Sequence, residues 1–133
     1  ATTPAQYAAL AAFDADPGDA EAVRTMVDVF RRRRDHVVAL FRERMPRVSF
    51  VPPEGAFYLF FRIDDFYAPG TPDSIALCRM LLERAGVAVV PGAAFGDDRY
   101  ARLSFAASEE ALTLGIQRIA DALVPESRRR TGT

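Results

Sequence analysis

One arginine stands where a strand-forming pattern places it in the middle of a β-strand. Residues 100–106 read Tyr-Ala-Arg-Leu-Ser-Phe-Ala, and successive side chains of a strand point to opposite faces of a sheet. The apolar Leu103 and Phe105 then share the face that packs on the core. Arg102 falls on the opposite face, with a tyrosine and a serine as its neighbours. The pattern therefore predicts a guanidinium group that points away from the core.

Two interpretations of Arg102 are open from its position. In the first, the arginine is exposed on the solvent face of an antiparallel sheet and binds nothing. In the second, an anionic group lies opposite it, because a strand interior is an unusual place for an arginine without such a partner. Spacing alone favours the first interpretation.

The other residues with reactive side chains are isolated in the sequence. His36 is the single histidine and Cys78 the single cysteine, so no set of ligands stands at the spacing of a metal site. Cys78 falls on the apolar face of a predicted helix, where we expect an inert core thiol. For His36 we expect a structural role.

A run of four arginines, Arg31–Arg34, interrupts a predicted helix. Four consecutive helical residues sweep about 300° around the axis, so they cannot form one basic face. The run therefore indicates a solvated helix surface rather than a nucleic-acid site. Arg34 lies near the apolar seam, and we expect it to pair with an acidic residue.

Length and composition indicate one ordinary globular domain over residues 1–133. Half of the residues are apolar, the formal net charge is −1 and the pI is about 5.9, which does not suggest a surface for nucleic acid. A single cysteine allows no internal disulfide, so a cytoplasmic location is expected. No apolar run reaches the ~18 residues of a membrane span, and no signal-peptide pattern opens the chain.

Hydrophobic periodicity and turn residues predict helices that alternate with short strands. Segregated helices that cover a small, mostly antiparallel sheet define an α+β fold. The strand at 56–61 is apolar on both faces, so we expect it to be central or covered. The predicted helices are 4–13, 17–45, 72–85 and 109–123, and the predicted strands are 48–51, 56–61, 87–90 and 100–106.

Caps and apolar stripes sharpen the predicted helices. Residues 126–133 are expected to form a disordered tail. The predicted N-caps are Asp16, Thr71 and Ser108. The predicted buried stripes are Val23, Val27, Phe30, Val37, Phe41 and Met45; Ile75, Cys78, Leu81 and Leu82; and Leu112, Ile116, Ile119 and Leu123.

Several segments together resemble the C-terminal part of class I/II aminotransferases, the fold-type I enzymes that depend on pyridoxal phosphate (PLP). They are the pattern Pro-x-Gly-Ala-Phe-Tyr at 53–58, the run 86–92 with Phe95-Gly96, and Arg-x-Ser-Phe-Ala at 102–106 with Ser108-x-Glu110. The likeness covers almost the whole chain but only the last part of a family member.

This resemblance assigns roles to two residues. It implies that Arg102 binds the α-carboxylate of an amino-acid substrate, for which a guanidinium offers a planar fork of donors. A rigid strand keeps such a fork in place. The resemblance also implies that Phe57 lies near the substrate, and plain core packing is the alternative for Phe57.

The resemblance further implies a parent enzyme that moves an amino group between an amino acid and a 2-oxo acid. Such an enzyme holds PLP as a Schiff base on a lysine amine, whereas all 17 Lys+Arg residues of this chain are arginine. We therefore expect the small, substrate-closing domain of a homodimeric, aspartate-aminotransferase-like parent, inactive by itself. Residues 1–13 would link it to a missing large domain, without which Tyr7, Leu10 and Phe13 are exposed.

Two other functions stay open on the sequence. A free-standing carboxylate-binding or regulatory domain would use Arg102 in the same way without catalysis. An RNA-binding α+β module would need exposed aromatic residues beside basic ones on the sheet. Tyr58 and Phe60 are the aromatic residues in position, and no basic residue flanks them before Arg62. Because several motifs match at once, the sequence favours the enzyme.

Overall fold

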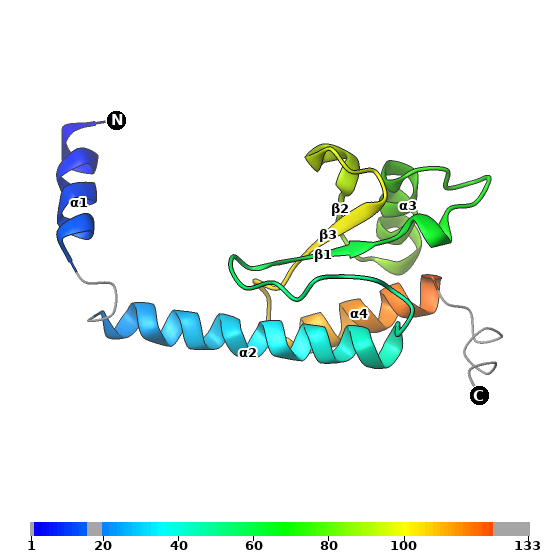
Figure 1. The fold of residues 1–133 in the computed structure, drawn as a ribbon, viewed down its shortest axis with the longest axis horizontal. Coiled ribbons are helices and arrows are strands. Elements are labelled where there is room, and N and C mark those ends of the chain that lie inside the picture. Colours follow the sequence, from blue (N-terminus) through cyan, green and yellow to red (C-terminus); the bar gives the residue numbers. More distant parts are fainter. Residues whose placement is uncertain (1, 16–19, 124–133) are drawn as a thin grey trace. The chain divides into compact units, whose positions relative to one another are not determined.

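The computed structural model describes residues 2–15 and 20–123, in two compact units, Ala1–Arg32 and Arg33–Thr133 (Figure 1). The long helix α2 (Glu21–Arg44) contributes residues to both units. The expected N-cap Asp16 and the expected tail 126–133 lie outside the described residues. The expectation of one domain over the whole chain stays a prediction.

Helix α1 (Thr3–Asp14) in the first unit forms because five of its residues are alanine and a proline stands in its first turn. It buries none of its side chains. Tyr7, Leu10 and Phe13 are 70%, 56% and 87% exposed, which confirms the predicted apolar surface. An exposed apolar surface of this kind favours self-association, which we expect for the isolated chain.

Three strands form the sheet of the second unit, which confirms the α+β fold with a small antiparallel sheet. β1 (Tyr58–Arg62) and β2 (Val90–Pro91) both pair antiparallel with β3 (Tyr100–Ser104), in the order β1-β3-β2. The register places Arg102 between Phe60 of β1 and Val90 of β2.

The predicted strands 56–61 and 100–106 are slightly shorter in the structure, as β1 and β3, and the other two are reduced much further. The segment 48–51 makes only an isolated bridge, Phe50 to Phe61, because two prolines without N–H donors follow it. The strand predicted at 87–90 is reduced to β2, since the Val87 N–H donates to the Leu81 carbonyl at a helix end. The central strand of the three is therefore β3. The strand 56–61 was expected to be central or covered, and β1 has β3 on one side and only the Phe50–Phe61 bridge on the other.

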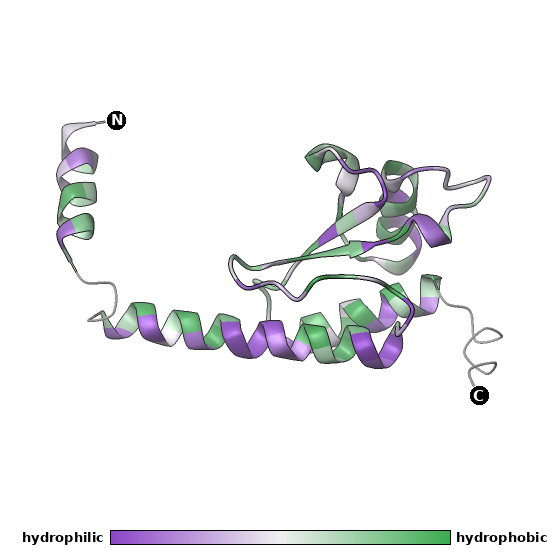
Figure 2. Cartoon of the chain, in the orientation of Figure 1, coloured by the Kyte–Doolittle hydropathy of each residue, from purple (hydrophilic) through white to green (hydrophobic). Residues whose placement is uncertain are grey.

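The core lies on one face of this sheet. Leu59, Phe61, Ala101 and Leu103 are buried there, and the ring of Phe41 from α2 meets the ring of Phe61 at 4.9 Å. Helix α4 (Glu109–Leu123) alternates hydrophobic and hydrophilic residues along its length (Figure 2). All four residues of its predicted stripe are buried, as are Val37, Phe41 and Met45 of the α2 stripe, whereas Val27 is 42% exposed.

Helix α3 (Ser74–Met80) continues as a wider π-helical turn, η2 (Leu81–Ala85), and ends at Gly86 with φ 65°. Its N-cap is Asp73, whose Oδ1 accepts from the Ala76 N–H at 2.8 Å. The predicted N-cap Thr71 was wrong, because Thr71 exchanges backbone hydrogen bonds with Ala68 in a turn.

The buried face of α3 also differs from the prediction at two positions. Ile75 and Leu82 are 51% and 54% exposed, so their assignment to the buried face was wrong. Ser74 turns inward to a hydrogen-bonded partner, and the π-helical turn then changes the angular spacing before Leu82. The residues that are buried are Ser74, Leu77, Cys78 and Leu81.

Two further expectations are settled by contacts at α4 and α2. Ser108 is confirmed as the N-cap of α4, since its Oγ accepts from the Ala111 N–H at 3.2 Å. Arg34 donates to the acidic Asp35 at 2.8 Å. None of the helices in the described ranges is long and apolar enough to cross a membrane.

Candidate functional site: an arginine between two aromatic rings

The face of the sheet that points away from the core is rich in aromatic and basic side chains. We call this face the outer face, and all its residues except the exposed Ser104 are half-buried. Alternation along two neighbouring strands produces it, because each strand buries its intervening residues. The outer face consists of Tyr58, Phe60 and Arg62 from β1 and Tyr100, Arg102 and Ser104 from β3.

Arg102 lies on the outer face, as its position in the strand pattern predicts. Its guanidinium carbon is 4.1 Å from the centroid of the Tyr58 ring and 4.4 Å from that of Phe95. Tyr58 is a diagonal neighbour across the β1–β3 pair, within reach of a long side chain. Cation–π contacts form at such distances, so both rings attract the charge of Arg102.

Phe95 reaches Arg102 from a tight turn, η3 (Gly92–Phe95), which follows β2. A Cβ atom at Gly92 would lie 2.2 Å from the Asp97 carbonyl oxygen and 2.4 Å from that of Tyr100, so only glycine fits there. The turn closes at Gly96, whose φ is 85°. These glycines let the chain fold back so that Phe95 lies over the outer face.

A hydrogen-bonded network around Asp98 fixes the same turn. The Ser74 hydroxyl donates to Asp98 Oδ1 at 2.6 Å, and the Ser74 N–H donates to the same oxygen at 3.1 Å. The Ala93 N–H donates to the Ser74 Oγ at 3.3 Å. The Tyr67 hydroxyl donates to the Asp98 carbonyl oxygen, and burial, with the Asp98 charge, raises the Tyr67 pKa to about 12.

Phe57 immediately precedes β1 and is 37% exposed, so it is not a plain core residue. Its ring meets that of Tyr58 at 4.4 Å, and Tyr58 in turn contacts Arg102. The Phe105 N–H donates to the Phe57 carbonyl at 2.9 Å, which fixes the backbone there. The structure thus joins Phe57 and Arg102 through one tyrosine. The nearness of Phe57 to a substrate stays a prediction.

Two neighbouring arginines have carboxylate partners. Arg62 donates to both oxygens of Asp64 at 2.6 and 2.7 Å, and Arg99 donates to both oxygens of Asp97 at 2.9 and 2.7 Å. These hydrogen bonds raise the pKa of each guanidinium; they hold the Asp64 pKa below its usual range and lower that of Asp97 to about 2.

Arg102 differs from both. Within residues 2–15 and 20–123, no carboxylate forms an ion pair or hydrogen bond with it. Its contacts are the faces of two rings, which take none of its N–H donors. The site can therefore accept an anion that this part of the chain does not itself provide.

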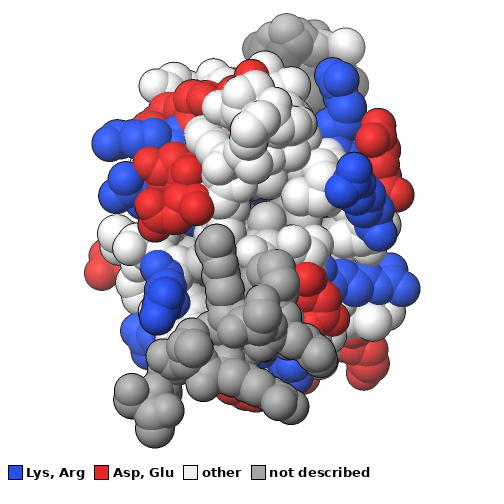
Figure 3. Space-filling model, turned by 90° about the vertical axis from the view of Figure 1, so that its right-hand side faces the viewer, with Lys and Arg blue, Asp and Glu red and all other residues white. Residues whose placement is uncertain are grey.

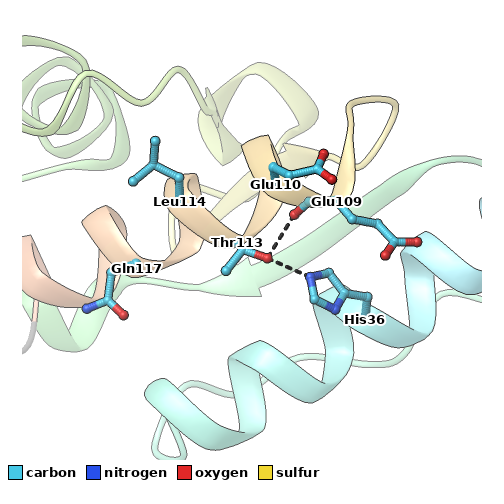
Figure 4. Close-up of a pocket in the computed structure, with 6 residues that line it drawn as sticks. All are labelled: His36, Glu109, Glu110, Thr113, Leu114 and Gln117. Carbon is cyan, nitrogen blue, oxygen red and sulfur yellow. Dashed lines mark hydrogen bonds between the residues drawn. The ribbon is translucent and has the colours of Figure 1, made fainter.

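A second group of polar residues lies between α2 and α4, in a shallow pocket (Figure 4). The Thr113 hydroxyl donates to the Glu109 carbonyl at 2.8 Å, so its oxygen accepts from His36 Nε2 at 2.7 Å. These two hydrogen bonds together assign the proton of His36 to Nε2. His36 thereby links two helices, as expected of a structural residue. The pocket is lined by His36, Glu109, Glu110, Thr113, Leu114 and Gln117.

Positive and negative side chains are mixed on the described part of the face in Figure 3. Arginine side chains lie beside acidic ones at both margins of this face, and neutral residues lie between them in its upper part. Cys78 is buried, and burial, with the Asp98 charge, raises its pKa to about 11. In the part of the chain described here, no group of three His, Cys, Asp or Glu side chains is placed to hold a metal ion.

Sequence reasoning missed the role of Tyr58 and Phe95 beside Arg102. Strand alternation does place Tyr58 on the same face as Arg102, so half of this contact was accessible from the pattern. Phe95 approaches from a turn, and no periodicity predicts where a turn residue points. The turn signal Pro91-Gly92 and the Phe95-Gly96 pair were the only indications.

Comparisons with known proteins identify the family. Residues 1–119 match the family described as aminotransferase class I and II. A probable aspartate/prephenate aminotransferase of Aquifex aeolicus is 47% identical over 124 residues, which are 92% of this chain and 30% of that protein. A bifunctional aspartate aminotransferase and glutamate/aspartate-prephenate aminotransferase of Petunia hybrida is 43% identical over 130 residues, 93% of this chain and 27% of that protein.

Comparison with a solved structure points to the same family. The crystal structure of the aspartate aminotransferase of Thermotoga maritima superposes with a TM-score of 0.73 at 43% identity, over 92% of this chain and 28% of that one. The chain thus spans less than a third of the length of the relatives it matches. The described α+β unit corresponds to a part of such enzymes, and the chain belongs to the class I and II aminotransferase family.

Proposed function

We propose that this chain is the C-terminal, substrate-closing domain of a PLP-dependent aminotransferase and that Arg102 binds the α-carboxylate of the substrate. The parent moves an amino group between an amino acid and a 2-oxo acid. Relatives named aspartate or aspartate/prephenate aminotransferase support an aspartate-type parent. The proposal includes a large domain that carries the cofactor, a homodimeric parent and a cytoplasmic location.

One observation carries the proposal. Arg62 and Arg99 have their donor forks filled by carboxylates, whereas among the described residues Arg102 has only rings as partners. A guanidinium fork binds a carboxylate through two parallel hydrogen bonds, so an α-carboxylate suits the N–H donors of Arg102. Held on a rigid strand, the fork would orient the substrate, and closure of the domain would exclude water.

The chain itself does not fit PLP as a covalent cofactor. An aminotransferase holds PLP on a lysine amine, where PLP acts as the electron sink of the reaction. No lysine occurs among the 133 residues, so this chain offers no side chain for that bond. Its contribution is confined to the substrate carboxylate and to closure.

The test is Arg102→Lys in the full-length enzyme, or in a chimera in which this chain replaces the matching part of the Thermotoga maritima enzyme. Lysine keeps the charge but loses the bidentate fork, so the carboxylate is held at one point. We expect kcat/KM for the amino acid to fall about 100-fold, or ~3 kcal/mol at 1.4 kcal/mol per decade. The unfolding free energy should change by less than about 1 kcal/mol.

An amine substrate that lacks the α-carboxylate is the control. Its kcat/KM should change little in Arg102→Lys, because it never makes the lost contact. Equal damage to both substrates, or damage to neither, would show that Arg102 does not bind the carboxylate.

A separate test concerns the chain by itself, which we propose is inactive. The chain is mixed with PLP and reduced with borohydride, and the modified peptides are mapped by mass. We expect modification at the N-terminal amine alone, because no lysine amine is present. A modified internal peptide, or transamination by the isolated chain, would contradict this.

A further inference from the structure

Two aromatic rings hold the guanidinium of Arg102, and we propose that Tyr58 and Phe95 are positioning residues for it. They keep the planar group flat between their rings, so that its N–H edge is presented to an incoming carboxylate. This inference rests on the proposed function of Arg102. It adds two residues that act through Arg102 and need not touch the substrate.

The geometry of a guanidinium explains why rings suit this task. All its N–H donors lie in the plane of the group, and its two faces carry none. The Tyr58 and Phe95 centroids are 4.1 and 4.4 Å from the guanidinium carbon. Two rings cannot occupy the same space, so they approach the group from different directions. They restrain Arg102 and leave its donors unused.

Arg62 and Arg99 are oriented by the opposite means. Each is held by a carboxylate that takes two of its donors, at distances from 2.6 to 2.9 Å. Such a pair orients the side chain and occupies the edge that a ligand would need. Restraint by rings is therefore the arrangement on this sheet that combines a fixed orientation with an available fork.

The two rings are themselves held in place. The Phe57 ring contacts Tyr58 at 4.4 Å, and the Phe60 ring meets Phe95 edge-on at 6.1 Å and 89°. Phe60 in turn stacks on Tyr100 at 4.8 Å and 8°. The turn that carries Phe95 is fixed at its start by the close backbone approach at Gly92. Arg102 is thus restrained by rings whose own freedom is limited.

The first experiment observes Arg102 directly in the ¹⁵N-labelled chain. The Arg102 Nε–H signal is assigned by its loss in Arg102→Lys. Ring faces shield protons above them, so we expect this signal upfield of exposed arginines. Tyr58→Leu and Phe95→Leu should each move it downfield, whereas Tyr58→Phe and Phe95→Tyr keep the ring and should keep the shift. Phe13→Leu is the matched control, because Phe13 is 87% exposed on α1.

The second experiment measures kinetics in the full-length enzyme or the chimera. Tyr58→Leu and Phe95→Leu should each lower kcat/KM for the amino acid about 3- to 10-fold, the range of one cation–π contact. The ring-keeping variants should restore it. An amine substrate without the α-carboxylate should respond to none of them. Tyr58→Met and Phe95→Met replace the leucine variants if those lose the folded spectrum.

The outcomes separate this inference from the function on which it rests. An Arg102 signal that stays in place in both ring-less variants overturns the positioning role, whatever Arg102→Lys does. A signal that moves while kcat/KM falls only in Arg102→Lys also overturns it and leaves the proposed function intact. An unchanged kcat/KM in Arg102→Lys overturns the proposed function first. Movement of the signal together with a carboxylate-specific loss supports both.

Discussion

Arg62 and Arg102 lie on the same face of one small sheet and are surrounded differently. Arg62 ends β1 and donates to both oxygens of Asp64, and nearby Arg99 binds Asp97 in the same way. Arg102 lies in the middle of β3 between the rings of Tyr58 and Phe95. Arg62 and Arg99 are therefore paired with carboxylates of the chain itself, whereas Arg102 is available to a carboxylate from outside it.

The difference follows from the residues two positions away. Asp64 stands two residues after Arg62, and Asp97 two residues before Arg99, in turns that bring each carboxylate back to its guanidinium. The corresponding neighbours of Arg102 are Tyr100 and Ser104. Arg62 and Arg99 are therefore satisfied by carboxylates in the turns beside the sheet, whereas the two neighbours that share the face of Arg102 in β3 are not carboxylates.

The largest effect should come from Gly92→Ala. The new Cβ would lie 2.2 Å from one backbone oxygen and 2.4 Å from another, so the turn that carries Phe95 must move. We expect a loss of about 3 kcal/mol in unfolding free energy, measured by denaturant titration. Gly70→Ala is the matched control, since a Cβ there meets nothing within 4 Å. A Gly92→Ala chain as stable as the wild type would disprove the close approach.

A smaller effect is expected when Arg102 is given a carboxylate partner from the chain itself. Ser104→Asp places a carboxylate two residues from Arg102 on the same face of β3. We expect kcat/KM for the amino acid to fall about 2- to 5-fold in the full-length enzyme, because an internal anion competes with the substrate.

Ser104→Asn controls for the size of this substitution and should lose much less. The reverse change, Asp64→Asn, removes the carboxylate that binds Arg62. It should not raise kcat/KM for the amino acid. Equal effects of Ser104→Asp and Ser104→Asn would mean that charge competition is not the cause.

The smallest effect concerns the acid titration of Asp97 in its pair with Arg99. The hydrogen bonds from Arg99 lower the Asp97 pKa to about 2, from its usual 3.8. A depressed folded pKa means that this pair's contribution to stability is complete above pH ~4 and is lost as the pH falls through about 2. Carboxyl ¹³C shifts should show it, and Arg99→Gln should return the Asp97 pKa towards 3.8. An Asp97 that titrates near 3.8 in the folded chain would show that Arg99 does not hold its carboxylate.

Strong periodicity made some elements predictable from the sequence. The apolar stripe of α4 and the alternation along β3 each depend on one regular pattern, and both were confirmed. The outward direction of Arg102 follows from the same alternation. These features need no knowledge of distant residues.

Features set by tertiary partners were not predictable in the same way. Ile75 was assigned to the core because its apolar side chain suits burial, yet Ser74 takes that place through its bond to Asp98. The N-cap moved from Thr71 to Asp73 for a similar reason, since Thr71 is used in a turn. The contact of Phe95 with Arg102 depends on a turn whose path is fixed by backbone contacts at Gly92.

Asp98 couples three segments that are separate in the sequence. Its carboxylate holds Ser74 at the start of α3, its carbonyl accepts from Tyr67, and Ser74 in turn accepts from Ala93 beside β2. Because Asp98 and Ser74 bind groups from all three segments, we expect these segments to open together in local unfolding. Their amide hydrogens should then be protected from exchange with solvent by a similar opening free energy. We therefore expect the local opening of the turn that carries Phe95 to depend on the Asp98 carboxylate, three residues further along the chain.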